Sequence, residues 1–397
     1  MALFAPAALA VMLPVASLVI PSQLILRKLA GVAHNTYSPP VTSCSPSIPP
    51  SPSPGTPLSI LTYNIAGLST HVNINPPVAR LREFFVRLAA APNSPDVVAF
   101  QESFSPTVSA LIKEHLSAAY PHMLLDAISI PPTLPGWGPI LSMNSGLVVV
   151  SKHPIKFAQA RAFTGSCGAD YHSNKGCVAV GIEAPGSGAT IIVYTSHTQS
   201  DPTMDPLWWF DFSTFPSPAR KAAEVKESQI RELGAFVATI QAAHPGCPGF
   251  LVGDLNVVGE ELSPPDADSH VVAAQTNKHR QMMEMLREAC PGIELEDCFR
   301  AAHPLSPDSM PLDEVGVTFS GSGNADCDLG CFQRLDYAIS VSPSGGGKAA
   351  DVEDIRVLDM RWDEVPLEDE LDGKVGRSGE RVKCFSDHAA LLLKAKY

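Results

Sequence analysis

The sequence predicts an α/β layered protein, and three observations carry this prediction. Short apolar runs rich in Val, Ile and Leu recur along residues 58–397, as in strands buried on both faces. Between these runs, apolar residues repeat at intervals of three and four, the period of amphipathic helices. The chain has 397 residues, 45% hydrophobic and 17% charged, enough to bury a sizeable core. Mixed strands and amphipathic helices favour sheets covered by helices.

Eight segments are predicted as strands because each is a short run of mostly apolar or β-branched residues. They are residues 58–65, 96–102, 146–151, 177–183, 190–197, 249–256, 336–340 and 389–395. Apolar residues spaced three, four and three apart predict one helix around residues 78–88 and another around residues 230–240. We expect a third helix over residues 271–289.

The N-terminal region divides into two parts before the folded unit. Residues 1–37 are predicted to be a signal peptide or an N-terminal anchor, because everything before Arg27 is uncharged and mostly apolar. Neither alternative is preferred by the flanks, since no positive charge precedes the apolar run and three prolines interrupt it. Residues 38–57 are rich in Pro and Ser and predict an extended linker. The folded catalytic unit then covers residues 58–397, and we expect a secreted or membrane-anchored protein.

The charge balance bears on the partners of this chain. The formal net charge is −13 and no Lys/Arg-rich run is present, so little surface is available to neutralise a nucleic-acid backbone. We expect no stable nucleic-acid partner, and we expect a monomer. A nuclease that binds briefly through a divalent ion is still compatible with this composition, because the ion supplies local positive charge.

Nine cysteines suggest either disulfides or small buried side chains. No Cys-x-x-Cys pair occurs, which argues against a zinc ribbon. Close spacing suggests three candidate pairs, and the odd count leaves at least one thiol unpaired. These pairs are Cys327 with Cys331, Cys290 with Cys298, and Cys167 with Cys177.

Polar side chains stand at the ends of several predicted strands, and strand ends gathered at one sheet edge often form active sites. Asn64 lies in an otherwise apolar strand, where an unpaired amide costs about 1 to 3 kcal/mol, so it needs a partner, structural or functional. Glu102 follows another strand and is either a solvated terminus or an oxygen ligand for a hard cation. His197 ends a third strand beside hydroxyl and amide groups.

Further polar residues follow the same pattern. Asp254 and Asn256 alternate along one strand end, so both side chains point to the same side, although such residues also form ordinary turns. Lys175, before another strand, is either a phosphate-steering cation or a turn residue. Asp336 and the dipeptide Asp387-His388 supply carboxylates and an imidazole that together form an oriented base, or alternatively an ion pair or a cap.

The order of these six motifs along the chain resembles a known family. Asn, Glu, His, Asp-x-Asn, Asp and Asp-His occur in the order and approximate spacing of the endonuclease/exonuclease/phosphatase superfamily. That superfamily includes deoxyribonuclease I, abasic-site endonucleases, inositol polyphosphate 5-phosphatases and neutral sphingomyelinases. The resemblance covers residues 58–397. It implies a four-layered α/β sandwich of two packed mixed β-sheets flanked by helices, as in deoxyribonuclease I.

The resemblance also implies metal-dependent phosphodiester hydrolysis by in-line attack of water, with Mg²⁺ or another hard divalent cation such as Mn²⁺. The implied metal ligands are Asn64, Glu102, Asp254, Asp387 and His388. The implied catalytic group is His197, Asp254, Asn256, Asp336 and His388, with His388 as general base oriented by Asp336. The implied substrate-binding group is Asn64, Lys175, His197 and Asn256. One metal ion or two are both compatible with this set.

A smaller set of residues is similar to the neutral sphingomyelinase branch, namely the segments Asn144-Ser-Gly-Leu147, Asn174-Lys-Gly176 and His197-Thr-Gln199. After Asn256 the chain has two valines instead of the aromatic residue and Arg of the 5-phosphatases. We therefore expect hydrolysis of sphingomyelin to ceramide and phosphocholine at a phospholipid membrane surface. A secreted endonuclease similar to deoxyribonuclease I and an inositol polyphosphate phosphatase are the alternatives.

The segment 207–212 contains four aromatic residues between two prolines and shows no helix or strand period. Trp and Phe favour the membrane interface, so this segment is predicted to contact lipid, or alternatively to pack over the core.

Overall fold

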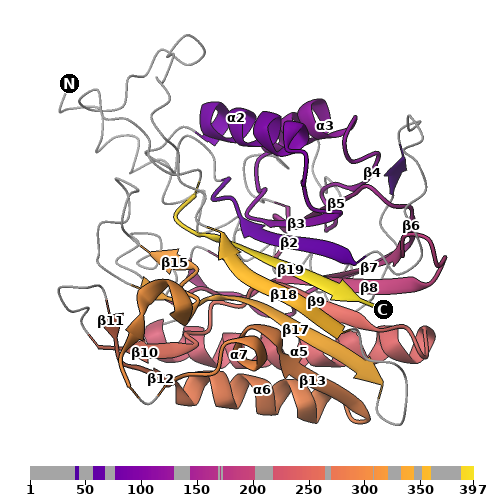
Figure 1. Cartoon of the computed structure of the whole chain (residues 1–397). Coiled ribbons are helices and arrows are strands. Elements are labelled where there is room, and N and C mark those ends of the chain that lie inside the picture. The colour runs from indigo at the N-terminus through magenta and orange to yellow at the C-terminus, as the bar shows by residue number, and fades with distance from the viewer. Residues whose placement is uncertain are drawn as a thin grey trace, which may run out of the picture.

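Two β-sheets packed face to face form the centre of the molecule, and helices cover both outer faces (Figure 1). The computed structural model describes residues 41–43, 57–67, 77–128, 144–168, 170, 173–201, 218–263, 270–306, 308–320, 332–343, 351–358 and 386–397. The expected four-layered α/β sandwich is therefore confirmed.

The first sheet has seven strands and contains both the first and the last long strands of the folded unit. Its order is β1 (Thr42–Ser43), β4 (His122–Leu124), β5 (Val148–Ser151), β3 (Val97–Gln101), β2 (Leu58–Asn64), β19 (Ala390–Lys396) and β18 (Asp351–Leu358). Strands β2 and β3 are parallel, while the other neighbours are antiparallel. Strand β1 belongs to the predicted Pro/Ser-rich linker, so that segment is not structureless throughout.

The second sheet has six strands, and its central pair is also parallel. Its order is β13 (Ile293–Asp297), β17 (Asp336–Pro343), β9 (Gly249–Asp254), β8 (Thr190–His197), β7 (Gly176–Glu183) and β6 (Ile155–Ala162). The parallel pair is β8 with β9. Each sheet thus has one parallel pair at its centre, and the carboxyl ends of parallel strands meet at one edge.

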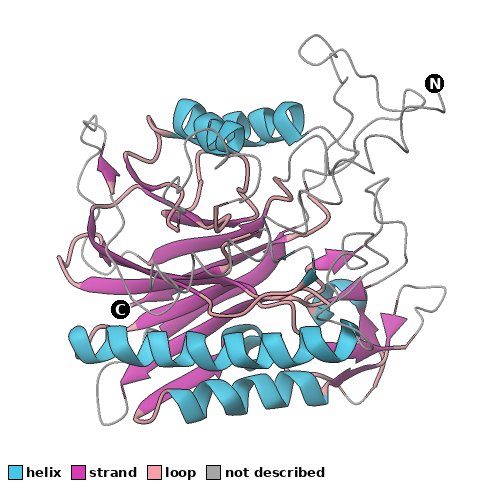
Figure 2. Cartoon of the chain, turned by 180° about the vertical axis from the view of Figure 1, so that it is seen from behind, coloured by secondary structure: helices cyan, strands magenta, loops and turns pink. Residues whose placement is uncertain are grey.

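Helices α2 (Pro77–Ala90) and α3 (Pro106–Leu116) cover the outer face of the first sheet. Helices α5 (Pro218–Ala243) and α6 (Asn277–Ala289) lie side by side over the outer face of the second sheet (Figure 2). Three apolar clusters result, one under each helix pair and one between the sheets. A short helix, α7 (Cys298–Ala302), and a 3₁₀ turn, η4 (Leu312–Val315), stand near the end of the second sheet.

Three two-strand pairs complete the fold near the edge where the motifs lie. They are β10 (Glu260–Leu262) with β12 (Ala273–Gln275), β11 (His270–Val271) with β14 (Met310–Pro311), and β15 (Phe319–Ser320) with β16 (Phe332–Gln333). The expected helix over residues 271–289 is wrong in its first turns. Thr276 is in an extended conformation and its side chain accepts the N–H of His279, so the helix begins at Asn277.

All eight predicted strands are present, but three edge strands of five or more residues, β6, β13 and β18, were not predicted. Along each of them, more exposed and less exposed side chains alternate for part of the length. One-sided burial leaves a mixed polar and apolar sequence, which is a weaker signal than the apolar runs of central strands.

Two of the three suggested disulfides are wrong. Cys167, Cys177, Cys290 and Cys298 are all buried free thiols. They behave as small apolar side chains, and Cys177, for example, packs in the cluster under α5 and α6. Cys327 and Cys331 lie outside the described residues. Within the described part of the chain, no helix is long and apolar enough to cross a membrane.

Candidate active site

The strand register brings the predicted site residues to one edge of the two sheets. His197 and Asp254 end the parallel strands β8 and β9 and are direct neighbours, and Asp254 faces Asp336 at the start of β17. In the other sheet, Asn64 ends β2 opposite the last residue of β3, and Glu102 follows that residue. The edge therefore gathers side chains that are up to 324 positions apart in the sequence.

A glycine permits this close alignment of β8 and β9. Gly253 has φ +136°, and a Cβ atom there would lie 2.2 Å from the carbonyl oxygen of Ser196. Any other residue would push the two strands apart just before Asp254.

Asn64 joins the two sheets. Its Nδ2 donates to Glu102 Oε1 at 3.0 Å and to Asp254 Oδ2 at 3.0 Å, and lies 3.4 Å from His388 Nε2. Its Oδ1 accepts the backbone N–H of Ala66 at 3.0 Å. The amide N–H groups are thus used by site residues, while Oδ1 accepts one backbone hydrogen bond and keeps a second lone pair. Asn64 therefore positions Glu102 and Asp254, and its role as a metal ligand stays a prediction.

Asp336 and His388 form a buried pair. His388 Nδ1 lies 2.8 Å from Asp336 Oδ2, and the ring Nε2 faces Asp254 Oδ2 at 3.8 Å. The backbone N–H of Asp336 donates to Thr318 Oγ1 at 3.0 Å, which fixes the start of β17. The second carboxylate oxygen, Asp336 Oδ1, is buried without a hydrogen-bond partner. The structure thus places Asp336 where the sequence analysis expected it, orienting the His388 ring.

Glu102 and Asp387 add two more carboxylates. Glu102 has φ +62°, an uncommon conformation for a residue with a Cβ, and this turns its side chain toward Asn64 and His197. Burial, the larger cause, and the charge of Asp387 raise the pKa of Glu102 to about 7. Asp387 is half-buried and its Oδ1 accepts a hydrogen bond from Ser386 at 3.1 Å.

His197 is held by Lys175. Lys175 Nζ lies 3.0 Å from His197 Nε2, donates to the carbonyl of Thr198 at 2.9 Å, and pairs with Asp170 Oδ1 at 2.8 Å. An ammonium group has three N–H donors, so all of them are used. The predicted substrate contact of Lys175 is not tested by this arrangement, but the geometry favours support of His197 over direct phosphate binding. Burial, followed by the charge of Lys175, lowers the pKa of His197 well below its usual range.

Asn256 lies beside this group on the rim. Its backbone N–H donates to Asp254 Oδ1 at 2.8 Å, and its Nδ2 donates to the carbonyl of Thr198 at 3.2 Å. Two residues that the sequence analysis did not single out therefore support the site, Asp170 and Thr198. Thr198 directly follows His197 and was visible as a hydroxyl neighbour, whereas Asp170 lies in an irregular segment with no local signal.

Asn144, at the start of a segment similar to the sphingomyelinases, has a turn role here. Its Oδ1 accepts the N–H of Gly146 at 2.8 Å, and its Nδ2 donates to Asp126. These contacts fix the turn before β5 and place no polar atom of Asn144 in the group around Asp254.

We name the carboxylates Glu102, Asp254, Asp336 and Asp387, together with His388, the acidic cluster. Burial, the largest cause, and the charge of Asp336 raise the pKa of Asp254 to about 6. Burial disfavours the charged form of His388, but Asp336, Asp254 and Asp387 outweigh it and raise the His388 pKa well above its usual range. Four carboxylates thus face one imidazolium, and the Lys175 ammonium is a second cation that acts on Glu102 and Asp254, so the carboxylates outnumber the cations.

The acidic cluster fits a hard divalent cation. Two overlapping sets have all their ligand atoms within 4.8 Å of one another, Glu102 with His197 and Asp254, and Asp254 with Asp336 and His388. The donors are carboxylate oxygens and imidazole nitrogens, which suit Mg²⁺ and Mn²⁺. Among the described residues Asp336 Oδ1 has no hydrogen-bond partner, and the pKa values of Glu102 and Asp254 are raised, mainly by burial. Both observations fit carboxylates that a bound cation would stabilise.

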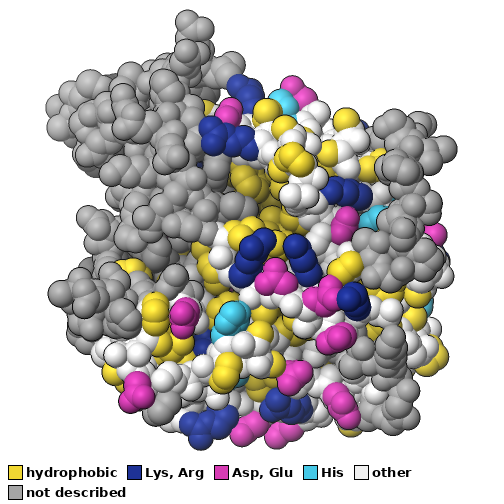
Figure 3. Space-filling model, in the orientation of Figure 1, with side chains coloured by type: hydrophobic (Ala, Val, Ile, Leu, Met, Phe, Trp, Pro, Cys, Tyr) yellow, Lys and Arg dark blue, Asp and Glu magenta, His cyan; other side chains and the backbone are white. Residues whose placement is uncertain are grey.

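Basic side chains do not gather in a broad patch on the face drawn in Figure 3. Lys and Arg are scattered there among Asp and Glu over the described residues. Attraction of a polyanion over a wide surface is therefore not provided by this face.

Comparison with known proteins shows one family. The sequence model of the Endonuclease/Exonuclease/phosphatase family matches residues 61–388. A curated phospholipase C of Staphylococcus aureus is 25% identical over 209 residues, which are 51% of this chain and 58% of that protein. The aligned region thus spans under two thirds of this relative.

Several solved structures have the same fold. SmcL covers 85% of this chain and 99% of its own at 19% identity, with a TM-score of 0.58. A sphingomyelinase C from Streptomyces griseocarneus covers the same shares at 20% identity and a TM-score of 0.54. A mutant beta toxin of Staphylococcus aureus with bound magnesium ions is 19% identical, covers 86% of this chain and 99% of its own, and has a TM-score of 0.55.

Proposed function

Because this chain belongs to the endonuclease/exonuclease/phosphatase family, we propose that it is a phosphoric diester hydrolase that uses a hard divalent cation. The substrate that we propose is sphingomyelin, cleaved to ceramide and phosphocholine. The observation that carries the proposal is the acidic cluster, in which buried carboxylates of the second sheet and half-buried carboxylates beside the first surround an imidazole that is hydrogen-bonded to Asp336.

Different residues are proposed to bind the cation and the substrate. Glu102 and Asp254 are the carboxylates proposed to hold the cation, with Asp387 and His388 beside them. When bound, the cation would supply positive charge that offsets the repulsion between the phosphodiester and an attacking water. His197 and Asn256 are proposed to hold the non-bridging oxygens, while Asn64 and Lys175 keep the carboxylates and His197 in place.

His388 is proposed to take the proton of the attacking water at Nε2, because Nδ1 is bonded to Asp336. Asp336, Asp254 and Asp387 raise the pKa of His388. A cation bound by Asp254 would offset part of this charge and lower the His388 pKa toward the range of a general base.

The choice of sphingomyelin rests on the sequence segments described above and on the names of the similar proteins. A structure of TDP2 from Caenorhabditis elegans has the same fold at 16% identity and a TM-score of 0.50, so the fold by itself does not select the substrate. The net charge of −13 disfavours a polyanionic nucleic acid as substrate.

One parallel assay tests the proposal. The full chain with Mg²⁺ is offered sphingomyelin vesicles, duplex DNA and an inositol polyphosphate, and the released products are measured. We expect turnover of sphingomyelin that chelation abolishes. Turnover of DNA or of the inositol polyphosphate without turnover of sphingomyelin would contradict sphingomyelin as the substrate. Full turnover in excess chelator would refute the role of the cation.

Calorimetry with Mg²⁺ tests the ligand assignment without a substrate. Glu102→Gln removes one charged oxygen donor, so we expect a clear loss of Mg²⁺ affinity. The matched control is His388→Ala, which should weaken Mg²⁺ binding less because the carboxylates remain. Equal affinities for the wild type and Glu102→Gln would contradict the assignment.

We further propose that the substrate is met at a phospholipid membrane surface, after entry of the chain into the secretory pathway. Residues 1–37 and the aromatic segment 207–212 on which this rests lie outside the described residues. Replacing Trp208 and Trp209 by Ala should weaken binding to sphingomyelin vesicles while sparing hydrolysis of a short soluble phosphodiester. Equal loss on both substrates with a lower melting temperature would place these rings in the core.

A further inference from the structure

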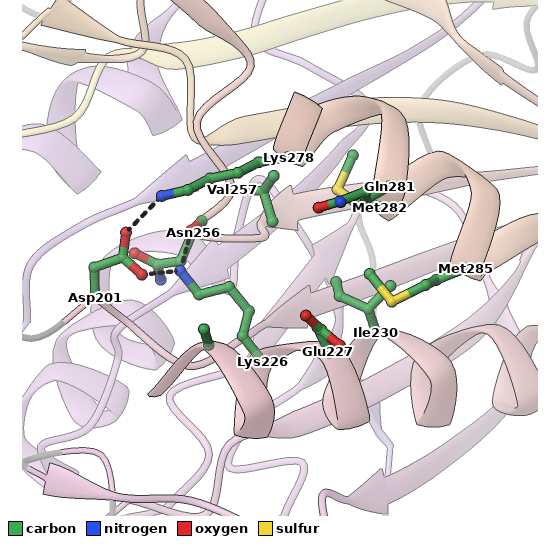
Figure 4. A pocket seen from close by; sticks show the side chains of 11 residues that line it. Asp201, Lys226, Glu227, Ile230, Asn256, Val257, Lys278, Gln281, Met282 and Met285 are labelled. Atoms are coloured by element: carbon green, nitrogen blue, oxygen red, sulfur yellow. Dashed lines mark hydrogen bonds and ion pairs between the residues drawn. The ribbon is translucent and has the colours of Figure 1, made fainter. Parts of the chain in front are cut away.

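A buried lysine outside the predicted site contacts the rim of the active site. Lys226, on helix α5, donates to the backbone carbonyl of Asn256 and lies 2.6 Å from Asp201 Oδ1 (Figure 4). The Lys226 residue is only 9% exposed. A second lysine, Lys278 on α6, approaches the same Asp201 at 3.6 Å but is 63% exposed.

Asn256 needs such support because of its backbone. Its φ of +49° lies in the left-handed region, which Asn adopts more readily than other residues with a Cβ but still at a cost that local hydrogen bonds must offset. Three of its polar groups have partners, since the N–H donates to Asp254, Nδ2 donates to Thr198 and the carbonyl accepts from Lys226. Among the described residues, no hydrogen bond uses Asn256 Oδ1.

A crevice borders Asn256, and Lys226 lines this crevice. A narrow crevice of about 170 Å³ lies between α5 and α6, lined by Asn256, Lys226 and apolar side chains such as Met282 (Figure 4). Leu255 and Val257 on either side belong to the apolar cluster under α5 and α6, so the crevice interrupts this packing beside Asn256 itself. Within the described part of the chain, the ammonium of Lys226 is the polar link between α5 and the Asn256 carbonyl.

Burying this ammonium has a cost that an exposed lysine would avoid. Burial lowers the pKa of Lys226, and the charge of Asp201 offsets part of this effect. The partner Asp201 is itself 51% exposed, so a purely structural ion pair would need no burial of the lysine. What the buried position adds is the contact with the Asn256 carbonyl.

We propose that Lys226 is a positioning residue that holds the Asn256 carbonyl and thereby aims the Asn256 side chain at the phosphodiester. The proposal rests on the proposed function, in which Asn256 binds a non-bridging oxygen. Among the described residues, no hydrogen bond or ion pair joins Lys226 to the acidic cluster, and the charge of Asp254 is the weakest influence on its pKa. Most of its effect on the reaction should therefore pass through Asn256.

A double-mutant cycle tests this route. Lys226→Met keeps the apolar stem and removes the ammonium, and it should lower kcat/KM on a soluble phosphodiester by about 10- to 100-fold, the size expected for small misplacements of a binding group. In an Asn256→Ala background the same change should lower kcat/KM by about threefold or less, because the group that it positions is gone. An equal fold-change in both backgrounds would overturn the proposal.

Lys278→Met is the matched control, since Lys278 shares Asp201 but, among the described residues, donates no hydrogen bond to Asn256. It should leave kcat/KM within about twofold of the wild type, as surface substitutions usually do. Lys226→Gln, which keeps N–H donors without the charge, should lie between wild type and Lys226→Met. A loss for Lys278→Met as large as that for Lys226→Met would assign the effect to Asp201 and overturn the proposal.

An activity-independent measurement separates this inference from the proposed function. Amide hydrogen exchange of residues 254–257 should be faster in Lys226→Met than in wild type, and unchanged in Lys278→Met. If the wild type hydrolyses none of the assayed substrates, the proposed function fails while this exchange pattern still supports Lys226 as the support of the turn. Unchanged exchange in Lys226→Met would overturn the inference whatever the activity.

Discussion

Two buried charged clusters stand at the same end of the molecule and differ in how their charges are balanced. The Arg334 cluster consists of Arg334, Glu260, Asp297, His279 and Arg300. Arg334 binds Glu260 at 2.8 Å and Asp297 at 2.9 Å, and His279 reaches Asp297 at 2.9 Å. Each carboxylate there has at least one cationic partner. In the acidic cluster, four carboxylates share one imidazole and the amide of Asn64.

The pKa directions follow from this difference. In the Arg334 cluster, burial opposes the charged form of Asp297, but Arg334 outweighs it and the Asp297 pKa is well below its usual range. In the acidic cluster, burial dominates and raises the pKa of Glu102 to about 7. A cluster that supplies its own cations stabilises the fold, whereas a cluster that lacks them is prepared to take a cation from outside.

The largest loss of folding stability is expected from Arg334→Met. It leaves Glu260 and Asp297 buried with fewer cationic partners, and breaking a buried ion pair in this way costs about 3 to 5 kcal/mol. Urea unfolding measures the loss. Arg87→Met is the control, since its exposed pair with Glu83 should contribute about 0 to 1 kcal/mol. Equal losses would mean that the Arg334 cluster is not a stabilising unit.

His388→Ala should affect the reaction more than the fold. Loss of a general base lowers kcat by about 10² to 10⁴, or about 3 to 5 kcal/mol of barrier. Without metal, His388→Ala should lower the free energy of unfolding by less than Arg334→Met does. Steady-state kinetics and urea unfolding on the same preparation compare the two. A near-normal kcat would remove His388 from the mechanism.

The two clusters should respond to pH with opposite signs. The folded-state pKa values of Glu102 and Asp254 are raised to about 7 and about 6, so between about pH 4 and 7 the folded protein binds more protons than the unfolded chain. The metal-free stability attributable to these groups should therefore fall as pH rises through this window, by about 1.4 kcal/mol for each unit by which a pKa is raised. The contribution of Asp297, whose pKa is lowered, is present above about pH 4 and is lost as pH falls.

Urea unfolding in chelator across this range measures the pH response, and Glu102→Gln should flatten the slope. Added Mg²⁺ should oppose the loss at high pH, because it binds the deprotonated carboxylates. A stability that rises between pH 5 and 7 by the same amount in wild type and Glu102→Gln would refute the account of the acidic cluster.

The smallest change in folding stability is expected from Asp254→Asn in the absence of metal. The amide removes one of the repelling charges, but it keeps an oxygen for only one of the two donors, Asn64 and Asn256, so stability at pH 7 should change by only about 1 kcal/mol or less. Thermal unfolding in chelator measures this change. The same variant should lose Mg²⁺ affinity. A loss of stability similar to that of Arg334→Met would show that both clusters serve the fold alike.

Much of the fold was predictable because buried strands and amphipathic helices leave local periodic patterns. All eight predicted strands and two of the three helices came from such patterns, and the third helix was misplaced only where Thr276 ends a strand pair and begins α6. The edge strands β6, β13 and β18 were not predicted, because a strand with one buried face reads as a mixed sequence.

The sequence by itself determined which residue types stand at the strand ends, and their order identified the family. Only the tertiary structure decided how they pair. His388 meets Asp336 across 52 positions, and Asn64 meets Asp254 across 190, through the packing of two sheets. The support of the site by Asp170 and Lys226 was likewise invisible in the sequence. A local pattern reports which faces are buried, whereas contacts at about 3 Å between distant residues depend on how whole layers pack.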